Sequence, residues 1–181
     1  MKNQIQKPSK MNKNLILTGM MGVGKSTIGK NLAKKLKYNF VDIDRLIEAK
    51  EGGSINRIFK NKNESYFRKV ESEITLQELK KDNSVISLGG GAFLDKLIRA
   101  KVKKTSISFW LDISVNELIK RLKKTKKRPL LYKKNINNTV KELYSERKKI
   151  YNEADYKIKC NFLRSNEIVN KIIGLYENSG N

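Results

Sequence analysis

The sequence predicts an α/β fold in which a parallel sheet is covered by helices on both faces. Short apolar runs that suit buried strands alternate along the chain with segments of helical period. A glycine-rich segment joins the first expected strand to the first expected helix, which is typical of α/β proteins that bind phosphate groups. The length of 181 residues suits one domain with a single core. We therefore expect residues 13–181 to form one domain.

The expected elements follow one another in regular order. Strands are expected where short apolar runs occur, at residues 15–17, 39–44, 85–88, 106–111 and 156–160. Helices are expected where apolar residues recur at helical spacing, at residues 25–36, 45–50, 55–59, 64–81, 94–102, 114–122, 138–151 and 165–176. Ligands of parallel sheets collect at the carboxyl ends of the strands, so the residues that follow the strands are the candidates for a site.

Composition excludes several kinds of chemistry. The chain has no histidine, which excludes histidine zinc sites, Ser-His triads and histidine general bases. Its single cysteine, Cys160, excludes an internal disulfide framework. Acid–base chemistry therefore depends on Asp, Glu, Lys or Tyr side chains.

The formal net charge of +22 raises two hypotheses about partners. A nucleic-acid binder would neutralise phosphates with a basic face, whereas an enzyme for anionic substrates would use the same field for steering. The lysine excess is spread widely, which is typical of solvated surface. The charges are not interleaved with aromatic residues in a recognisable reading module, so we expect no nucleic-acid partner.

The beginning of the chain is polar and basic. Residues 1–13 lack the apolar region of a signal peptide, and no run reaches the roughly 20 apolar residues of a membrane helix. We therefore expect a cytoplasmic protein without a membrane partner, in which residues 1–12 form a disordered basic extension. We also expect a monomer.

Residues 19–27 form the most specific motif in the sequence. They read Gly-Met-Met-Gly-Val-Gly-Lys-Ser-Thr and satisfy the P-loop pattern G-x-x-x-x-G-K-[ST]. Glycines let the backbone wrap closely so that its amides point at phosphate oxygens, and the following helix adds its positive end. Lys25 should neutralise the β- and γ-phosphates, and the Ser26 hydroxyl should ligate Mg²⁺. The expected nucleotide-binding residues are Gly22, Val23, Gly24, Lys25, Ser26 and Thr27.

The nucleotide is expected to be ATP. A GTPase would carry the guanine-reading pattern N-K-x-D, and the nearest segment, residues 61–64, ends in Glu and has no strand before it. Asp42 and Asp44 lie two residues apart at the end of the second expected strand, so they should point to the same side. Beside a P-loop, one carboxylate can hold a metal-bound water while the other faces an acceptor hydroxyl. The pattern D-x-D is a weak signal alone, because strand-end turns often carry two acids.

Five segments together carry a resemblance to a known family. They are residues 19–27, Asp42-Ile-Asp44, Tyr66-Phe-Arg-Lys-Val-Glu71, Ser87-Leu-Gly-Gly-Gly91 and Arg128-Pro-Leu-Leu131. In order and spacing, the chain resembles the shikimate kinase family from about Lys13 to Tyr176. The resemblance implies a three-layer sandwich with a five-stranded parallel sheet, a nucleoside-monophosphate-kinase-like fold and a closing lid. It also implies the transfer of the γ-phosphate of ATP to the 3-hydroxyl of shikimate in aromatic amino-acid synthesis.

The same resemblance implies a role for individual residues. Lys25, Asp44 and Arg128 would be catalytic, with Asp44 at the shikimate hydroxyls and Arg128 at the transferring phosphate. Asp42 would help to place Mg²⁺ through water, together with Ser26. The implied substrate-binding residues are Asp44, Arg68, Gly89, Gly90, Gly91 and Arg147, of which the two arginines hold the carboxylate. Arg121 and Arg164 match positions that flank adenine. Together with Arg128, they would bind ATP.

The segment from about 123 to 135 is the expected lid. It is basic, has no acidic residue and lacks helical period, so a solvated surface loop is the alternative. Two departures from the family pattern concern adenine: Leu122 replaces a usual Thr, and Asn166 replaces a frequent Pro. The alternative functions are a related small-molecule kinase such as a gluconate kinase, or a basic nucleic-acid-binding NTPase.

Overall fold

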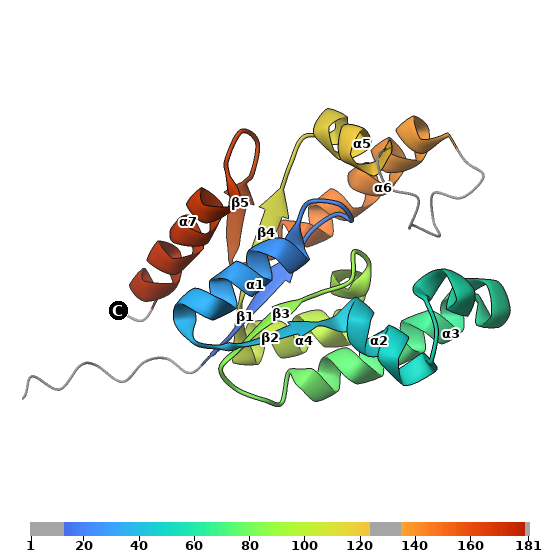
Figure 1. The fold of residues 1–181 in the computed structure, drawn as a ribbon, viewed down its shortest axis with the longest axis horizontal. Helices are drawn as coiled ribbons and strands as arrows, with labels where there is room; N and C mark the ends of the chain where they lie inside the picture. Colours follow the sequence, from blue (N-terminus) through green and yellow to red (C-terminus); the bar gives the residue numbers. More distant parts are fainter. Residues whose placement is uncertain (1–12, 124–134, 180–181) are drawn as a thin grey trace, which may run out of the picture.

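The computed structural model describes residues 13–123 and 135–179. The expected basic extension lies outside the described residues, as do Arg128 and nearly all of the expected lid. The described chain forms a five-stranded sheet in the order β2-β3-β1-β4-β5, and every pair of neighbouring strands is parallel. Helices lie on both faces of the sheet, which confirms the predicted fold class (Figure 1).

The strands match the apolar runs of the sequence. They are β1 (Asn14–Thr18), β2 (Asn39–Asp42), β3 (Ser84–Ser87), β4 (Ser106–Asp112) and β5 (Tyr156–Lys159). All five residues of β1 and all four of β3 are buried, because parallel strands are covered on both faces. The register pairs Leu15 with Val85 on one side and with Ile107 on the other, which places β1 at the centre of the core.

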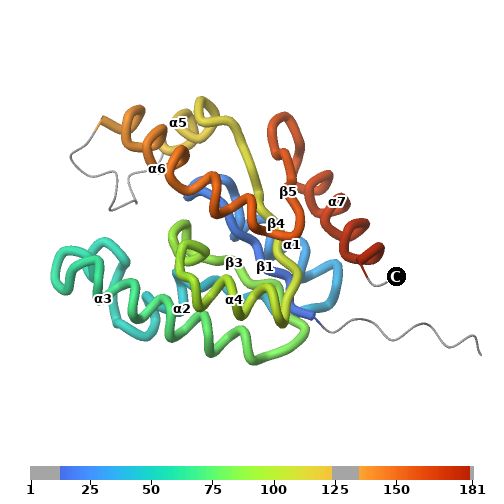
Figure 2. The backbone as a smooth tube through the Cα atoms, turned by 180° about the vertical axis from the view of Figure 1, so that it is seen from behind, coloured from blue at the N-terminus to red at the C-terminus, as the bar shows by residue number. Residues whose placement is uncertain are grey.

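The helices are α1 (Lys25–Leu36), α2 (Ile43–Glu51), α3 (Ile55–Glu78), α4 (Lys96–Thr105), α5 (Val115–Lys123), α6 (Ile136–Tyr151) and α7 (Ser165–Asn178). A short 3₁₀ turn, η1 (Ala92–Leu94), follows β3. Helices α1 and α7 cover one face of the sheet, and α4 and α6 lie on the other (Figures 1 and 2). Each buries one stripe against the sheet, as Ile28 and Leu32 do on α1.

Two sequence expectations are corrected at the end of β2. The strand ends at Asp42 and α2 begins at Ile43, so Asp44 lies in the first turn of a helix rather than on a strand. Asp42 caps this helix by accepting a hydrogen bond from the Arg45 amide at 3.4 Å. The capping preference of aspartate therefore prevails over the apolar run that suggested a longer strand.

The predicted break near residue 60 corresponds to a kink within α3. Asn63 has φ 67° and ψ 173°, which are not helical values, so it separates two helical parts of α3. The Asn63 side chain accepts a hydrogen bond from the Tyr66 amide at 3.0 Å and so caps the segment that carries Arg68.

Candidate active site

The P-loop connects β1 to α1 and surrounds the ammonium group of Lys25. Gly19, Gly22 and Gly24 have φ values of 131°, 81° and 105°, in a region that side chains rarely adopt. Lys25 Nζ donates hydrogen bonds to the carbonyl oxygens of Gly19 at 2.8 Å and Met20 at 3.0 Å. The ammonium group of Lys25 therefore lies against the backbone at the start of the loop.

A cavity of about 230 Å³ opens over the P-loop at the carboxyl ends of the strands. The predicted phosphate and metal residues line this cavity together with the end of β3, except Val23, which is buried and does not line it. It is lined by Gly22, Gly24, Lys25, Ser26, Thr27, Asp42, Asp44, Ser87, Leu88 and Gly90. The position of Asp44 on a helix therefore still brings both carboxylates to one site.

The oxygen donors of this cavity fit Mg²⁺. Ser26, Asp42 and Asp44 supply a hydroxyl and two carboxylates, which are the hard ligands that this ion prefers. Within residues 13–123 and 135–179, no group of three or more Asp, Glu, Cys or His side chains could hold a metal ion. An ion here would therefore depend on nucleotide phosphates and water for most of its ligands, as is usual for Mg²⁺.

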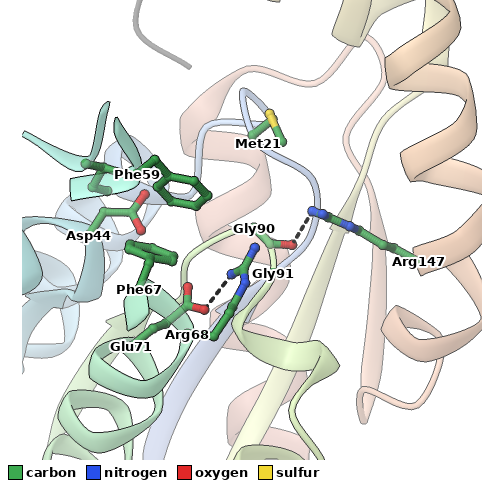
Figure 3. A pocket seen from close by; sticks show the side chains of 10 residues that line it. Met21, Asp44, Phe59, Phe67, Arg68, Glu71, Gly90, Gly91 and Arg147 are labelled. Atoms are coloured by element: carbon green, nitrogen blue, oxygen red, sulfur yellow. Dashed lines mark hydrogen bonds and ion pairs between the residues drawn. The ribbon is translucent and has the colours of Figure 1, made fainter. Parts of the chain in front are cut away.

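A second pocket of about 50 Å³ adjoins the first, between α3 and α6 (Figure 3). Two arginines, two carboxylates and two phenylalanine rings contribute to its wall. The lining residues are Met21, Asp44, Ile55, Phe59, Phe67, Arg68, Glu71, Gly90, Gly91 and Arg147. Asp44 and Gly90 line both cavities, so the two sites meet at these residues.

The Arg68 side chain is fixed by two glutamates of its own helix. Its Nη1 donates to Glu71 Oε2 at 2.6 Å, and its Nη2 donates to Glu64 Oε1 at 3.0 Å. Glu71 is 2 % exposed, and this burial raises the pKa of its carboxyl group, against the opposing effect of the Arg68 guanidinium. Its Oε1 atom has no hydrogen-bond partner among the described residues. The pair thus holds the guanidinium toward the pocket with a buried carboxylate behind it (Figure 3).

Charged side chains lie directly against Gly89 and Gly91 of the triple glycine. A Cβ atom at Gly89 would lie 2.3 Å from Glu71 Oε1 and 2.9 Å from Asp44 Oδ1. A Cβ atom at Gly91 would lie 2.4 Å from Arg68 Nη1. Only glycine therefore lets the carboxylates and the guanidinium lie against this backbone.

Arg147 approaches the pocket from α6, on the opposite side from Arg68 (Figure 3). It is 5 % exposed, and its Nη1 donates to the Gly90 carbonyl oxygen at 3.1 Å. Tyr151, one turn later on α6, donates its hydroxyl to the same oxygen. The sequence predicted Arg147 through the family motif but gave Tyr151 no role. The only indication of Tyr151 was its spacing of four residues from Arg147, which puts both side chains on one helix face.

The two arginines expected near adenine lie in different surroundings from each other. Arg121 Nη1 donates to the Val23 carbonyl at 3.2 Å and its Nε to Glu117 at 3.1 Å, so it lies against the P-loop. Arg164 is exposed at the start of α7, where its amide donates to Glu167 at 2.6 Å. Neither arginine lines the two cavities described above.

Comparison with known proteins assigns the chain and its fold to one family. A family model described as shikimate kinase matches residues 21–177. The chain belongs to the shikimate kinase family. It is 44 % identical to the shikimate kinase of Persephonella marina over 90 % of this chain and 98 % of that protein. It is 40 % identical to the shikimate kinase of Thermodesulfovibrio yellowstonii over 93 % and 98 % of the two chains.

Solved structures agree with this assignment. The shikimate kinase of Acinetobacter baumannii, in complex with shikimate, matches with a TM-score of 0.90 at 31 % identity, covering 94 % of this chain and 96 % of that one. The enzyme of Aquifex aeolicus matches with a TM-score of 0.82 at 36 % identity, covering 92 % and 98 %. A gluconokinase from Sinorhizobium meliloti matches with a TM-score of 0.58 at 14 % identity, covering 94 % and 97 %, which shows a shared fold alone. The gluconate kinase alternative is therefore not favoured.

Among the described residues, no helix combines the length and apolar character needed to span a bilayer.

Proposed function

We propose that this chain transfers the γ-phosphate of ATP to the 3-hydroxyl of shikimate, giving 3-phosphoshikimate and ADP. The observation that carries the proposal is the junction of the two cavities at Asp44 and Gly90. One cavity has the P-loop needed for the phosphates of ATP, and the other has paired arginines needed for an organic acid. A hydroxyl in the second cavity beside Asp44 would face the phosphate in the first.

The acceptor pocket suits a small carboxylic acid with hydroxyl groups. Arg68 and Arg147 approach it from opposite sides, and a guanidinium pairs with a carboxylate through two parallel hydrogen bonds. Phe59 and Phe67 form an apolar wall, with ring centroids 4.7 Å apart, that suits the face of a carbon ring. Asp44 then lies at the end of the pocket nearest the P-loop and accepts hydrogen bonds from the ring hydroxyls.

Transfer requires in-line approach and neutralisation of charge more than covalent participation by the protein. Asp44 accepts the proton as the 3-oxygen of shikimate bonds to the γ-phosphorus, and the bond from that phosphorus to the oxygen of ADP breaks. Lys25 and the amides of Gly22 and Gly24 stabilise the negative charge on the phosphate oxygens. Mg²⁺ held by Ser26, and by Asp42 through water, would neutralise the β- and γ-phosphates when it is bound.

Three further arginines belong to the proposal on the strength of the family motif. Arg128 would stabilise the transferring phosphate, with residues of the segment 123–135 around it. Arg121 and Arg164 would flank the base. The contact of Arg121 with the Val23 carbonyl supports a place near the nucleotide, while the exposure of Arg164 leaves its role to the motif alone.

The product identifies the reaction directly. Purified chain is incubated with ATP, MgCl₂ and shikimate, and the product is examined by mass spectrometry and by phosphorus–proton correlation in NMR. We expect shikimate with one added phosphate, whose phosphorus couples to the proton on carbon 3. Coupling to the proton on another carbon would contradict the placement of the 3-hydroxyl at Asp44. Absence of any phosphorylated shikimate would refute the function.

A further inference from the structure

The carbonyl oxygen of Gly90 accepts hydrogen bonds from two side chains of α6. Arg147 Nη1 donates to it at 3.1 Å, and the Tyr151 hydroxyl donates to it from the next turn. We refer to Arg147 and Tyr151 as the Gly90 clamp. Because Gly90 lines both cavities, the clamp fixes the backbone at the point where nucleotide and acceptor meet.

Tyr151 lies in the core between the acceptor loop and the P-loop. Its side chain is fully buried, and its ring centroid is 6.0 Å from that of Trp110 on β4. Its hydroxyl is 3.9 Å from the sulfur of Met20, a residue whose carbonyl accepts a hydrogen bond from Lys25. The Tyr151 hydroxyl therefore contacts residues of both substrate loops.

Arg147 and Tyr151 differ in the other groups that they can bind. Under the proposed function, Arg147 turns its guanidinium to the shikimate carboxylate, which competes with its bond to Gly90. A polar group in a desolvated site is unfavourable when it loses its hydrogen bond. Tyr151 has no second acceptor oxygen among the hydrogen bonds of the described chain, so its hydroxyl stays with Gly90. Burial also raises its pKa, which keeps it protonated as a donor.

We propose that Tyr151 is a positioning residue for the acceptor site. Its hydroxyl keeps the Gly90 carbonyl bonded while Arg147 moves to the substrate carboxylate, so carboxylate binding does not leave that carbonyl unpaired. The same bond holds the acceptor loop in register with the P-loop. The inference rests on the proposed function, since it assigns Arg147 to the carboxylate of shikimate.

Tyr151→Phe tests this role because it removes the hydroxyl and keeps the ring. We expect KM for shikimate to rise about tenfold, which is the order expected for one lost hydrogen bond, while KM for ATP changes less than about twofold. The matched control is Tyr144→Phe on the same helix, whose hydroxyl donates to Asp112 at 2.8 Å. Tyr144 lines neither cavity, so its variant should keep both KM values.

Binding can be read without turnover because the chain has a single tryptophan, Trp110, beside Tyr151. Its fluorescence during shikimate titration gives the dissociation constant, which should weaken in step with KM. A folded Tyr151→Phe protein with unchanged shikimate affinity would overturn the inference. Equal weakening toward shikimate and ATP would also overturn it, since that pattern indicates general loss of structure.

Arg147→Lys gives a second test of the inference, which does not require Tyr151→Phe to fold. With the guanidinium removed, Tyr151 alone holds the Gly90 carbonyl, so the thermal midpoint should stay within a few degrees of wild type while shikimate affinity falls. A large fall in the midpoint would show that Tyr151 does not hold this carbonyl unaided, contrary to the inference. Turnover of shikimate by the unaltered protein tests the proposed function separately, so the two failures are distinguishable.

Discussion

Arg68 and Arg147 reach one pocket from two helices that are far apart in the sequence. Arg68 is held by Glu64 and Glu71 before any ligand binds, whereas Arg147 is bonded to the Gly90 carbonyl and exchanges that bond for the substrate carboxylate. The preorganisation of Arg68 lowers the entropy cost of binding, because its side chain is already ordered. The two arginines should therefore account for much of the affinity for the acceptor.

Replacing either arginine by alanine should weaken acceptor binding selectively. We expect KM for shikimate to rise roughly 10- to 150-fold in Arg68→Ala and Arg147→Ala, since hydrogen bonds to charged groups contribute about 1.5–3 kcal/mol. KM for ATP should change little. Lys148→Ala, at an exposed position beside Arg147, is the control. An unchanged KM for shikimate in either variant would remove that arginine from the acceptor site.

The buried Glu71 carboxyl group should leave a signature in the pH dependence of stability. Burial raises its pKa above the ordinary value of 4.5, so the folded state binds a proton more readily than the unfolded state. The free energy of unfolding of the wild type, relative to Glu71→Gln, should therefore fall as pH rises through 4.5 and up to the raised pKa. Chemical denaturation at several pH values measures this difference. A relative stability that grows with pH would mean that the bond to Arg68 outweighs burial.

Among the individual residues of the candidate site, the sequence indicated some and not others. Lys25 and Ser26 were predictable because the P-loop is contiguous and each position has a fixed chemical duty. Arg68 and Arg147 required the family motif, since a helical arginine alone indicates a solvated charge. Tyr151 was missed because a tyrosine at apolar spacing indicates core, and the carbonyl it contacts comes from a distant loop.

Local signals decided most helix and strand boundaries. The sequence placed α1, the first part of β2 and β4 closely, because each combines an apolar run or period with a clear end. It extended β2 by two residues, since Ile43 continues the apolar run while the capping role of Asp42 is not visible in a period. The expected gap between two helices corresponds to Asn63, whose non-helical backbone separates the two parts of α3.

The end of α1 allows an element-scale test of stability. Lys37 follows the helix with φ 58° and is exposed, a conformation that suits glycine and costs other residues about 1–2 kcal/mol. Lys37→Gly should therefore stabilise the protein by about 1 kcal/mol. Lys34→Gly, at an exposed position inside the same helix, should destabilise it by about 1 kcal/mol. Urea unfolding of both variants checks the pair, and destabilisation by Lys37→Gly would contradict the assigned backbone conformation.

The whole chain combines a family fold with an unusually basic composition. The net charge of +22 alone suggested nucleic acid or an anionic substrate equally well. The order β2-β3-β1-β4-β5 brings the ends of β1, β2 and β3 together at one edge, which favours a site for a small anionic substrate there. The sequence predicted a parallel sheet from alternation and a five-stranded one from resemblance, but not the strand order, since pairing between distant segments is not a local property.

Acceptor selectivity tests the central claim most directly. ADP release is measured by a coupled assay with ATP and Mg²⁺ in the presence of shikimate, gluconate or nucleoside monophosphates at equal concentrations. The paired arginines, the aromatic wall and Asp44 predict rapid release with shikimate and no more than the acceptor-free rate with the others. Release with gluconate or a nucleoside monophosphate at a rate equal to or above that with shikimate would contradict the account.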